Sequence, residues 1–284
     1  MKKTKLEWVD STFNPISGCL YNCYYCYAKL IAEKYMNNKD SISKEHLDMI
    51  NNNLPILLED PIYNEDGKKS AYPFGFTPTF HKYRLKEVKS WDKPRSIFVG
   101  SMSDIFGDWI PDEWIEDILW TCACNHKHQY VFLTKNPKRY SKINNINLED
   151  EEGIYYNYRK AGIIKYGMKN TNIIDLSNFW MGATVTNNIQ LNEAYDSKAR
   201  WLSIEPLFEE LNVDELLLED GTNRWDWIVI GAETGERENK ITPKKEWINE
   251  IVKICLIFKI PVFMKNNLIP VIDERDLIKR YPWG

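Results

Sequence analysis

The chain has 284 residues, 43% of them hydrophobic and 13% aromatic, so it is long enough to bury a substantial core and too apolar to be disordered. Its net charge of −4 argues against a broadly basic surface that would coat nucleic acid by neutralising phosphates. No apolar run reaches the ~20 residues that span a bilayer, and residues 1–8 lack the apolar core of a signal peptide. We therefore expect a cytoplasmic protein with no membrane partner.

The first predicted elements are a strand over residues 5–13, where apolar and polar residues alternate, and a helix over residues 28–37. Asn14 and Pro15 turn the chain out of the strand, and Gly18 permits the backbone to approach a ligand closely. The order of these elements is strand, cysteine-containing loop, helix.

Three of the six cysteines lie in that loop in a C-x3-C-x2-C arrangement, at Cys19, Cys23 and Cys26. Three is an odd number for disulfides, and a closed zinc site usually takes four ligands. A [4Fe-4S] cluster is held by cysteine thiolates, and three protein ligands leave one iron free to bind another molecule. The pattern favours such a cluster. A chance group of buried thiols and a zinc site completed by distant histidines remain as alternatives.

Residues 38–95 have no long periodic element and include a polar turn at residues 64–67. A long irregular segment inside a compact domain is typical of a functional lid or an insertion, and the alternative is a surface excursion with a small core of its own. Basic residues among aromatics would let the segment face a nucleotide or nucleic acid, and a solvated face is the alternative for the same residues: His81, Lys82, Arg84, Lys86, Lys89, Lys93 and Arg95.

From residue 96 on, short apolar strands alternate with helices, which indicates a parallel sheet covered on both faces. The predicted strands are residues 96–100, 130–134, 179–186, 200–204, 227–231 and 261–264. Helices are predicted over residues 111–122 and 242–258, the second with Thr242 as N-cap and Pro243 at its first position. The chain has neither a dinucleotide-binding G-x-G-x-x-G nor a P-loop.

These elements predict an α/β fold with a partial (β/α) TIM-type barrel of about six to seven parallel strands. We expect a single domain, residues 1–284, with irregular insertions at about 38–95 and 141–177. Polar residues follow the predicted strand ends, where (β/α) barrels assemble their active sites: Ser101, Ser103, Asp104, Lys135, Thr184, Thr186, Glu205, Glu233 and Lys265. For any single one of them, a helix cap or a solvated turn is the alternative.

A second group of thiols and imidazoles, Cys122, Cys124, His126 and His128, has the spacing C-x-C-x-H-x-H. This spacing is too tight to wrap four ligands around one ion without strain. A helix end with a histidine near its last carbonyls is favoured there, and metal binding stays open.

These motifs resemble the phage Gp37/Gp68-like family (DUF5131), a radical S-adenosylmethionine-like group. The resemblance rests on matching residues in the family's order: Trp8, Asn14-Pro15, Gly18-Cys19, Cys23, Cys26-Tyr27-Ala28, Phe80-His81, Leu85, Trp91, residues 93–95, Phe98-Val99, residues 101–106, 133–135, 202–207, 227–235 and 261–265. Two departures concern the substrate pocket. The chain has Ala232 and Thr234 in a motif usually read as Gly-Gly-Glu-Ser-Gly, and Asn266-Asn267 after the last lysine, where Gln-Trp-Gly is usual.

The resemblance implies that Cys19, Cys23 and Cys26 hold a [4Fe-4S] cluster whose open iron chelates S-adenosylmethionine. It also implies that Tyr25 lies against the adenine. Ser101, Ser103 and Asp104 are expected at the methionine end of the cofactor, and Thr184 and Thr186 near its ribose.

The implied activity is that of a radical enzyme, which reductively cleaves S-adenosylmethionine to start hydrogen abstraction from a substrate, with a flavodoxin or ferredoxin as electron donor. A nucleotide or nucleic acid is the favoured substrate, with a peptide or protein side chain and a small metabolite as alternatives. Lys135, Glu205, Glu233 and Lys265 are expected to orient it, with a structural Glu205–Lys265 or Glu233–Lys135 pair as the alternative. A non-catalytic nucleic-acid-binding or regulatory protein with a structural iron–sulfur or zinc site is the rival function.

Overall fold

The computed structural model describes residues 4, 6–36, 42–64, 66–143, 172–234 and 238–283. Most of the irregular segment predicted at 141–177 lies outside these residues. The chain divides into two compact units. Unit 1 comprises residues 1–4, 9–132 and 143–179, and unit 2 comprises residues 5–8, 133–142 and 180–284. The expectation of a single domain stays a prediction.

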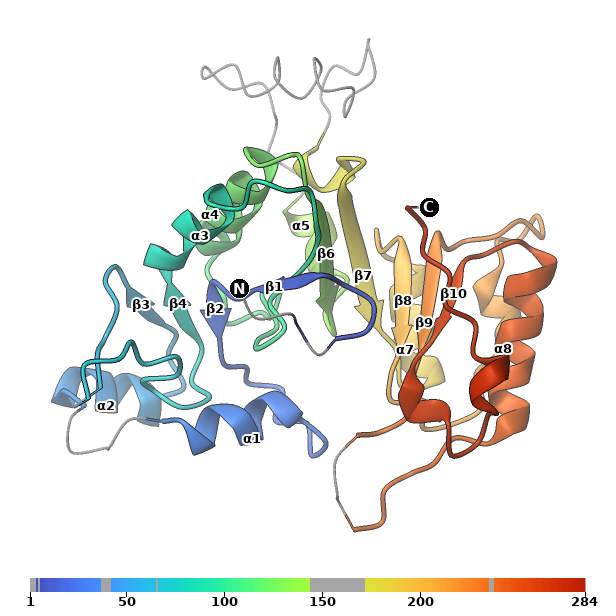
Figure 1. Ribbon diagram of the computed structural model, residues 1–284, viewed down its shortest axis with the longest axis horizontal. Coiled ribbons are helices and arrows are strands. Elements are labelled where there is room, and N and C mark those ends of the chain that lie inside the picture. Colours follow the sequence, from blue (N-terminus) through green and yellow to red (C-terminus); the bar gives the residue numbers. More distant parts are fainter. Residues whose placement is uncertain are drawn as a thin grey trace. The chain divides into compact units, whose positions relative to one another are not determined.

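Seven strands form the main sheet in the order β1-β5-β6-β7-β8-β9-β10 (Figure 1). Their bounds are β1 Ser11–Phe13, β5 Ser96–Val99, β6 Gln129–Thr134, β7 Phe179–Thr184, β8 Trp201–Ile204, β9 Trp227–Ile230 and β10 Val262–Met264. The pairings β1–β5, β5–β6, β7–β8, β8–β9 and β9–β10 are parallel.

This strand order follows the chain in one direction, as in a (β/α) barrel, and does not reverse as in a doubly wound sheet. The predicted α/β class with a partial TIM-type barrel is therefore confirmed. Nearly every strand residue is buried, which explains why the strands appear in the sequence as continuous apolar runs.

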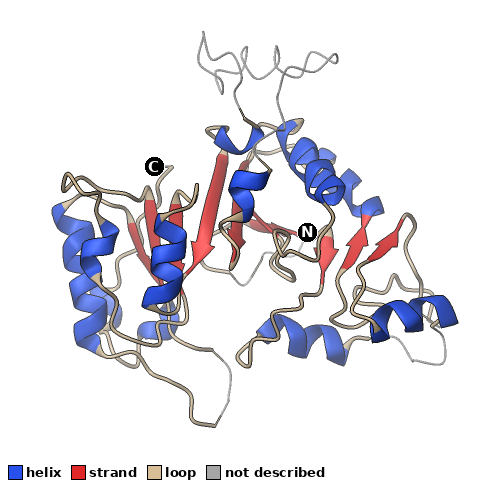
Figure 2. Ribbon diagram, turned by 180° about the vertical axis from the view of Figure 1, so that it is seen from behind, coloured by secondary structure: helices blue, strands red, loops and turns tan. Residues whose placement is uncertain are grey.

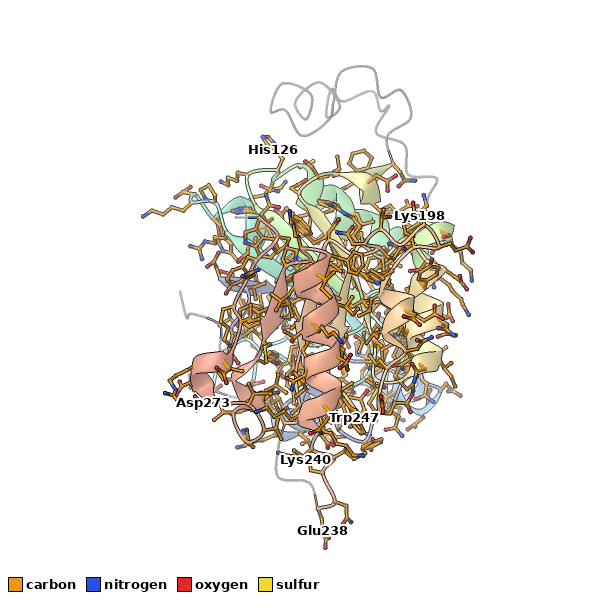
Figure 3. The ribbon with its side chains drawn as sticks, turned by 90° about the vertical axis from the view of Figure 1, so that its right-hand side faces the viewer. His126, Lys198, Glu238, Lys240, Trp247 and Asp273 are labelled. Carbon is orange, nitrogen blue, oxygen red and sulfur yellow. The ribbon has the colours of Figure 1, made fainter. Side chains whose placement is uncertain are left out.

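The helices that accompany the sheet are α1 Tyr27–Lys34, α4 Asp112–Ala123, α5 Arg139–Lys142, α7 Asn188–Tyr195 and α8 Lys245–Ile257, with short 3-10 turns at Ile173–Asp175, Val213–Leu216, Asn266–Leu268 and Glu274–Asp276. Each of these helices buries one or more residues, although Leu30 of α1 and Ile189 of α7 are exposed. Helices stand in front of the strands in Figure 2, and Figure 3 shows α8 with Trp247 near its amino-terminal end. Ile248, Ile251 and Cys255 form the buried face of α8.

Several predicted boundaries are wrong. The helix predicted over residues 28–37 ends at Lys34. The first strand begins at Ser11 and not at residue 5, because Trp8 belongs to unit 2, where its ring packs on Trp201 at 5.6 Å and Trp227 at 5.8 Å. Helix α8 begins three residues after the predicted N-cap Thr242: Pro243 is buried, and the extended Lys244 precedes the first turn.

Within unit 1, two strands from residues 42–95 join a strand before the cysteine loop in a second sheet of three strands, which the sequence does not predict. Its order is β2-β4-β3, with β2 Ile16–Ser17, β3 Ile56–Leu58 and β4 Thr79–His81; α2 Lys44–Asn51, the 3-10 turn Lys82–Leu85 and α3 Lys86–Lys89 complete the segment (Figure 1). It has a small core of its own, made of Ile42, Ile56, Leu58 and Phe74. The segment is therefore structured, and one of its strands pairs with the residues that lead into the cysteine loop.

Candidate functional site

The cysteine loop of unit 1 connects β2 to α1, and its path is fixed at Gly18. Gly18 has a φ of +88°, and a Cβ there would overlap the carbonyl oxygens of Phe76 and Thr77. The Gly18 N–H donates to the Met102 carbonyl at 2.9 Å, and the Cys19 N–H donates to the Phe76 carbonyl at 3.2 Å. The first cysteine is thereby held between the second sheet and the loop that follows β5.

The three loop thiols form no disulfide, are half-buried and lie close enough to influence one another. Burial raises the pKa of the Cys19 thiol to about 12, and the charges of Asp104, Cys23 and Cys26 add to this rise, although a backbone hydrogen bond from Tyr21 opposes it. Such a thiol is protonated at neutral pH. A bound cation reverses this preference, because coordination stabilises the thiolate.

Two tyrosines of the loop line the same cysteines. Burial raises the pKa of Tyr25, and the charge of Cys23 and a hydrogen bond with it raise that pKa further. Burial also raises the pKa of Tyr21, which lies near Asp104 and Cys19 and packs edge-on against Trp109 at 4.9 Å. The predicted cofactor residue Tyr25 is therefore adjacent to the thiols. Tyr21 was missed, although its place between two of the cysteines was a usable signal.

The predicted residues after β5 lie against the cysteine loop. Ser103 pairs with Gly18 in a parallel β-bridge. Asp104 is only 6% exposed, and its charge helps to raise the pKa of the Cys19 thiol. Oδ1 of Asn14 accepts from the Ser101 hydroxyl at 3.1 Å and from the Met102 N–H at 3.3 Å. Asn14 thus ties the turn between β1 and β2 to the loop after β5.

Two buried polar atoms beside the cysteine loop have no hydrogen-bond partner in the described part of the chain, the Ser103 hydroxyl and Nε1 of Trp109. A buried hydroxyl without a partner costs about 1–3 kcal/mol, so such atoms usually point to a missing ligand or water. Oδ1 of Asp104 accepts from the Phe106 N–H at 3.1 Å.

The donor set of the cysteine loop consists of the three thiols Cys19, Cys23 and Cys26. Within residues 4–283 as far as they are described, no three His, Cys, Asp or Glu side chains converge as ligands of one metal ion. A [4Fe-4S] cluster makes a different demand, because each thiolate binds a separate iron. Cys19, Cys23 and Cys26 are the residues that would hold such a cluster, and the cluster stays a prediction.

In unit 2, predicted residues after β8 and β10 come together. Lys265 forms an ion pair with Glu205, and both side chains are largely buried. The Asn267 side chain donates to Glu205 at 3.4 Å and to the Ala232 carbonyl at 2.7 Å, and it accepts from the Ala232 N–H. The structural pair that the sequence left as an alternative is thus present. Asn267, which takes part in this network, lies at one of the departures from the family pattern.

The other predicted residues of unit 2 differ in how far their polar atoms are engaged. The Thr186 N–H and hydroxyl both donate to Gln190, at 2.8 and 2.9 Å, which closes the turn into α7. Glu233 is 2% exposed and accepts from the Ile241 N–H at 3.4 Å. Thr184 at the end of β7 and Lys135 after β6 are half-buried. The roles predicted for these residues stay predictions.

The C-x-C-x-H-x-H group does not form a metal centre in the described residues. Cys122 is buried in α4, Cys124 is exposed, and His128 is buried between the rings of Trp91 and Tyr130, at 6.1 and 5.9 Å. His128 therefore acts as a core residue of unit 1. Its two ring nitrogens have no hydrogen-bond partner in the described chain.

Two buried histidines of unit 1 predict how its stability depends on pH. Burial lowers the pKa of His81 to about 2 and that of His128 to about 4, from 6.5. Below pH 6.5 the unfolded chain then binds more protons than the folded chain, so stability falls as the pH falls. Each imidazole contributes up to about 1.4 kcal/mol per pH unit until its folded-state pKa is reached.

Urea unfolding at pH 7, 6 and 5 measures this slope. The variant His128→Phe is expected to flatten it by about half, and an unchanged slope would contradict the assignment. Far-ultraviolet circular dichroism at each pH checks that the starting states are equally folded.

None of the helices in the described ranges is long and apolar enough to cross a membrane. Comparison with known proteins finds no curated protein and no solved structure that matches the chain. A family model described as a protein of unknown function, DUF5131, matches residues 3–268. Because this match takes in the cysteine loop and every strand of the main sheet, the chain belongs to the DUF5131 family.

Proposed function

We propose that the chain is a radical S-adenosylmethionine enzyme whose [4Fe-4S] cluster is held by Cys19, Cys23 and Cys26. The observation that carries this proposal is the packing of the three-thiol loop on the loop after β5, where Gly18 pairs with Ser103. When bound and reduced, such a cluster would supply one electron to S-adenosylmethionine, whose sulfonium C–S bond would break to give methionine and the 5′-deoxyadenosyl radical that abstracts hydrogen from the substrate.

The residues around the loop bind and orient the cofactor in this proposal. The Ser103 hydroxyl, which has no partner within the described residues, donates to the carboxylate of the methionine end, and the Asp104 carboxylate accepts from its ammonium. Tyr25 provides a ring for the adenine. Ser101 has a supporting role, because its hydroxyl is already bonded to Asn14.

Anaerobic reconstitution tests the proposed function against its rival. The proposal expects about four irons and four sulfides per chain, and release of 5′-deoxyadenosine when the reduced protein meets S-adenosylmethionine. Bound zinc without cofactor cleavage would favour a structural metal site in a non-catalytic protein.

Asp104 gives a sharper test of the cofactor site. The variant Asp104→Asn keeps an oxygen that can accept from the Phe106 N–H but removes the charge, so the iron content should not change. Loss of one charge-assisted hydrogen bond is expected to raise the Kd for S-adenosylmethionine about ten- to a hundredfold. Isothermal titration of the reconstituted protein measures this. The exposed neighbour Asp108, replaced with Asn, is the matched control, and equal Kd values for the wild type and Asp104→Asn would remove Asp104 from the site.

For the substrate we propose a nucleotide or nucleic acid, on a smaller basic surface than the sequence predicts. His81 is fully buried, and the Arg84 guanidinium donates to the Asn14 and Ala71 carbonyls, both at 3.0 Å. Arg95 bonds the Ser11 hydroxyl at 3.1 Å and lies over the Trp91 ring. The exposed basic residues that remain to support the proposal are Lys86, Lys89 and Lys93.

If a nucleic acid binds there, its affinity should fall steeply with added salt. The double variant Lys86→Glu/Lys89→Glu is expected to reduce the slope of log K against log salt by about 2, since at least two phosphate contacts are lost. Fluorescence anisotropy with a labelled single strand measures the slope. Lys253→Glu on α8 is the matched exposed control, and the proposal of a polymer is wrong if no DNA or RNA binds at low salt with S-adenosylmethionine present.

A further inference from the structure

A chain of hydrogen bonds runs through the interior of the second sheet and ends beside the cysteine loop. The Ser17 hydroxyl lies 2.8 Å from Nε2 of His81, and the Tyr83 hydroxyl lies 3.3 Å from Nδ1 of the same ring. Ser17 is 1% exposed and His81 is 0% exposed. Both ring nitrogens of this imidazole therefore lie within hydrogen-bond distance of a hydroxyl, which fixes the orientation of the ring.

The backbone around Ser17 is held by the same elements. Ser17 pairs with Thr79 across β2 and β4, and the His81 N–H donates to the Pro15 carbonyl at 2.7 Å. The next two residues are Gly18, whose position beside Thr77 leaves no room for a Cβ, and Cys19. Ser17 is thus the last residue before the first thiol whose side chain can anchor the loop.

We infer that the chain Ser17–His81–Tyr83 is a positioning device for Cys19. It sets the position from which the cysteine loop leaves β2, and so sets the place of the first thiol relative to Ser103. The inference rests on the proposed function in taking Cys19 as a cluster ligand. It also gives residues 42–95 a role as the support of the cysteine loop, in place of the lid over a substrate that the sequence left open.

Metal ligands are oriented by the groups that hydrogen-bond to them or to their backbone, and loss of such outer contacts weakens a site without removing a ligand. Ser17→Ala is the smallest change that breaks the chain, since it deletes one buried hydroxyl and keeps the β2–β4 pairing. Ser96→Ala is the matched control. It deletes another buried serine hydroxyl of unit 1, one that donates to Asp10 at 2.8 Å, and so should have a similar effect on the melting temperature.

The first measurement uses the protein without metal. The rate at which iodoacetamide alkylates Cys19, compared with Cys23 and Cys26, is followed by mass spectrometry of peptides. Ser17→Ala is expected to raise the Cys19 rate about fivefold, because one buried hydrogen bond no longer closes the loop, while Ser96→Ala leaves it unchanged.

The second measurement uses the reconstituted protein and the electron paramagnetic resonance spectrum of its reduced cluster with S-adenosylmethionine. Ser17→Ala is expected to keep its iron but to alter this spectrum and to raise the Kd for the cofactor about tenfold, whereas Ser96→Ala matches the wild type. The inference is overturned if Ser17→Ala and Ser96→Ala behave alike in both measurements. If the wild type binds no cluster while Ser17→Ala still exposes Cys19, the proposed function fails and the support of the loop by Ser17 stands.

Discussion

Replacing Cys23 with alanine is expected to lower the iron content of the anaerobically reconstituted protein from about four atoms per chain to background, and to abolish release of 5′-deoxyadenosine. The reason is the donor set. Cys19, Cys23 and Cys26 are close enough for their charges to interact, and the loop has no fourth cysteine that could replace one of them. Colorimetric iron and sulfide assays and chromatography of the reaction products measure both effects.

Two cysteines outside the loop provide the controls. Cys124→Ser removes an exposed thiol, and Cys122→Ala removes a buried one in α4. Both variants should keep the full iron content, because neither thiol belongs to the loop. Iron loss in these variants together with retention in Cys23→Ala would move the metal site to the C-x-C-x-H-x-H group.

The second large effect is expected at Gly18. Gly18→Ala places a side chain on a residue with a φ of +88° and drives its Cβ into the carbonyl oxygens of Phe76 and Thr77. The strained backbone costs about 1–2 kcal/mol. Displacing residues 76 and 77, which lead into β4, adds to this cost, so we expect Gly18→Ala to lower the free energy of unfolding by about 3–4 kcal/mol. Chemical denaturation measures the change.

Gly67 separates the two causes. It also has a positive φ, of +72°, but a Cβ there meets nothing within 4 Å. Gly67→Ala should therefore cost only the backbone strain of about 1–2 kcal/mol. Equal losses for the two variants would show that the contact with residues 76 and 77 does not matter, and the account of how the second sheet holds the cysteine loop would then be wrong.

The main sheet could be predicted because its signal is local. Strands such as Trp227–Ile230 are short apolar runs followed by polar residues, and their order along the chain is also their order in the sheet. The cysteine loop was predictable for the same reason, since its three thiols lie within eight residues. The resemblance predicted that the loop after β5 lies beside the cysteine loop. The same position follows because parallel strands have their carboxyl ends at one edge of the sheet.

The second sheet was not predictable, because its strands have only two or three residues and show no period. Without it, the basic residues of the segment looked like one solvated face. The structure instead buries His81 and bonds Arg84 to backbone carbonyls, because both hold the segment to the start of the chain. Tertiary pairing over more than 60 residues decides these positions, and a local pattern does not contain it.

The helix start predicted at Thr242 failed for a related reason. A threonine followed by proline is a common start of a helix, but Pro243 is buried and helical structure begins at Lys245. Trp8 likewise fits an alternating strand locally, yet its ring packs with the tryptophans of unit 2. Burial of one large or rigid side chain outweighed the local preference in both places.

The central claim is that three thiolates of one loop hold a cluster with one open iron. Mössbauer spectroscopy of the protein reconstituted with ⁵⁷Fe tests it most directly, because it distinguishes an iron bound by cysteine from one bound by other ligands. The account predicts a [4Fe-4S] spectrum in which one of about four irons changes its parameters when S-adenosylmethionine is added, and in which Cys23→Ala has no cluster. A spectrum without such a cluster, or one in which no iron responds to S-adenosylmethionine, would contradict it.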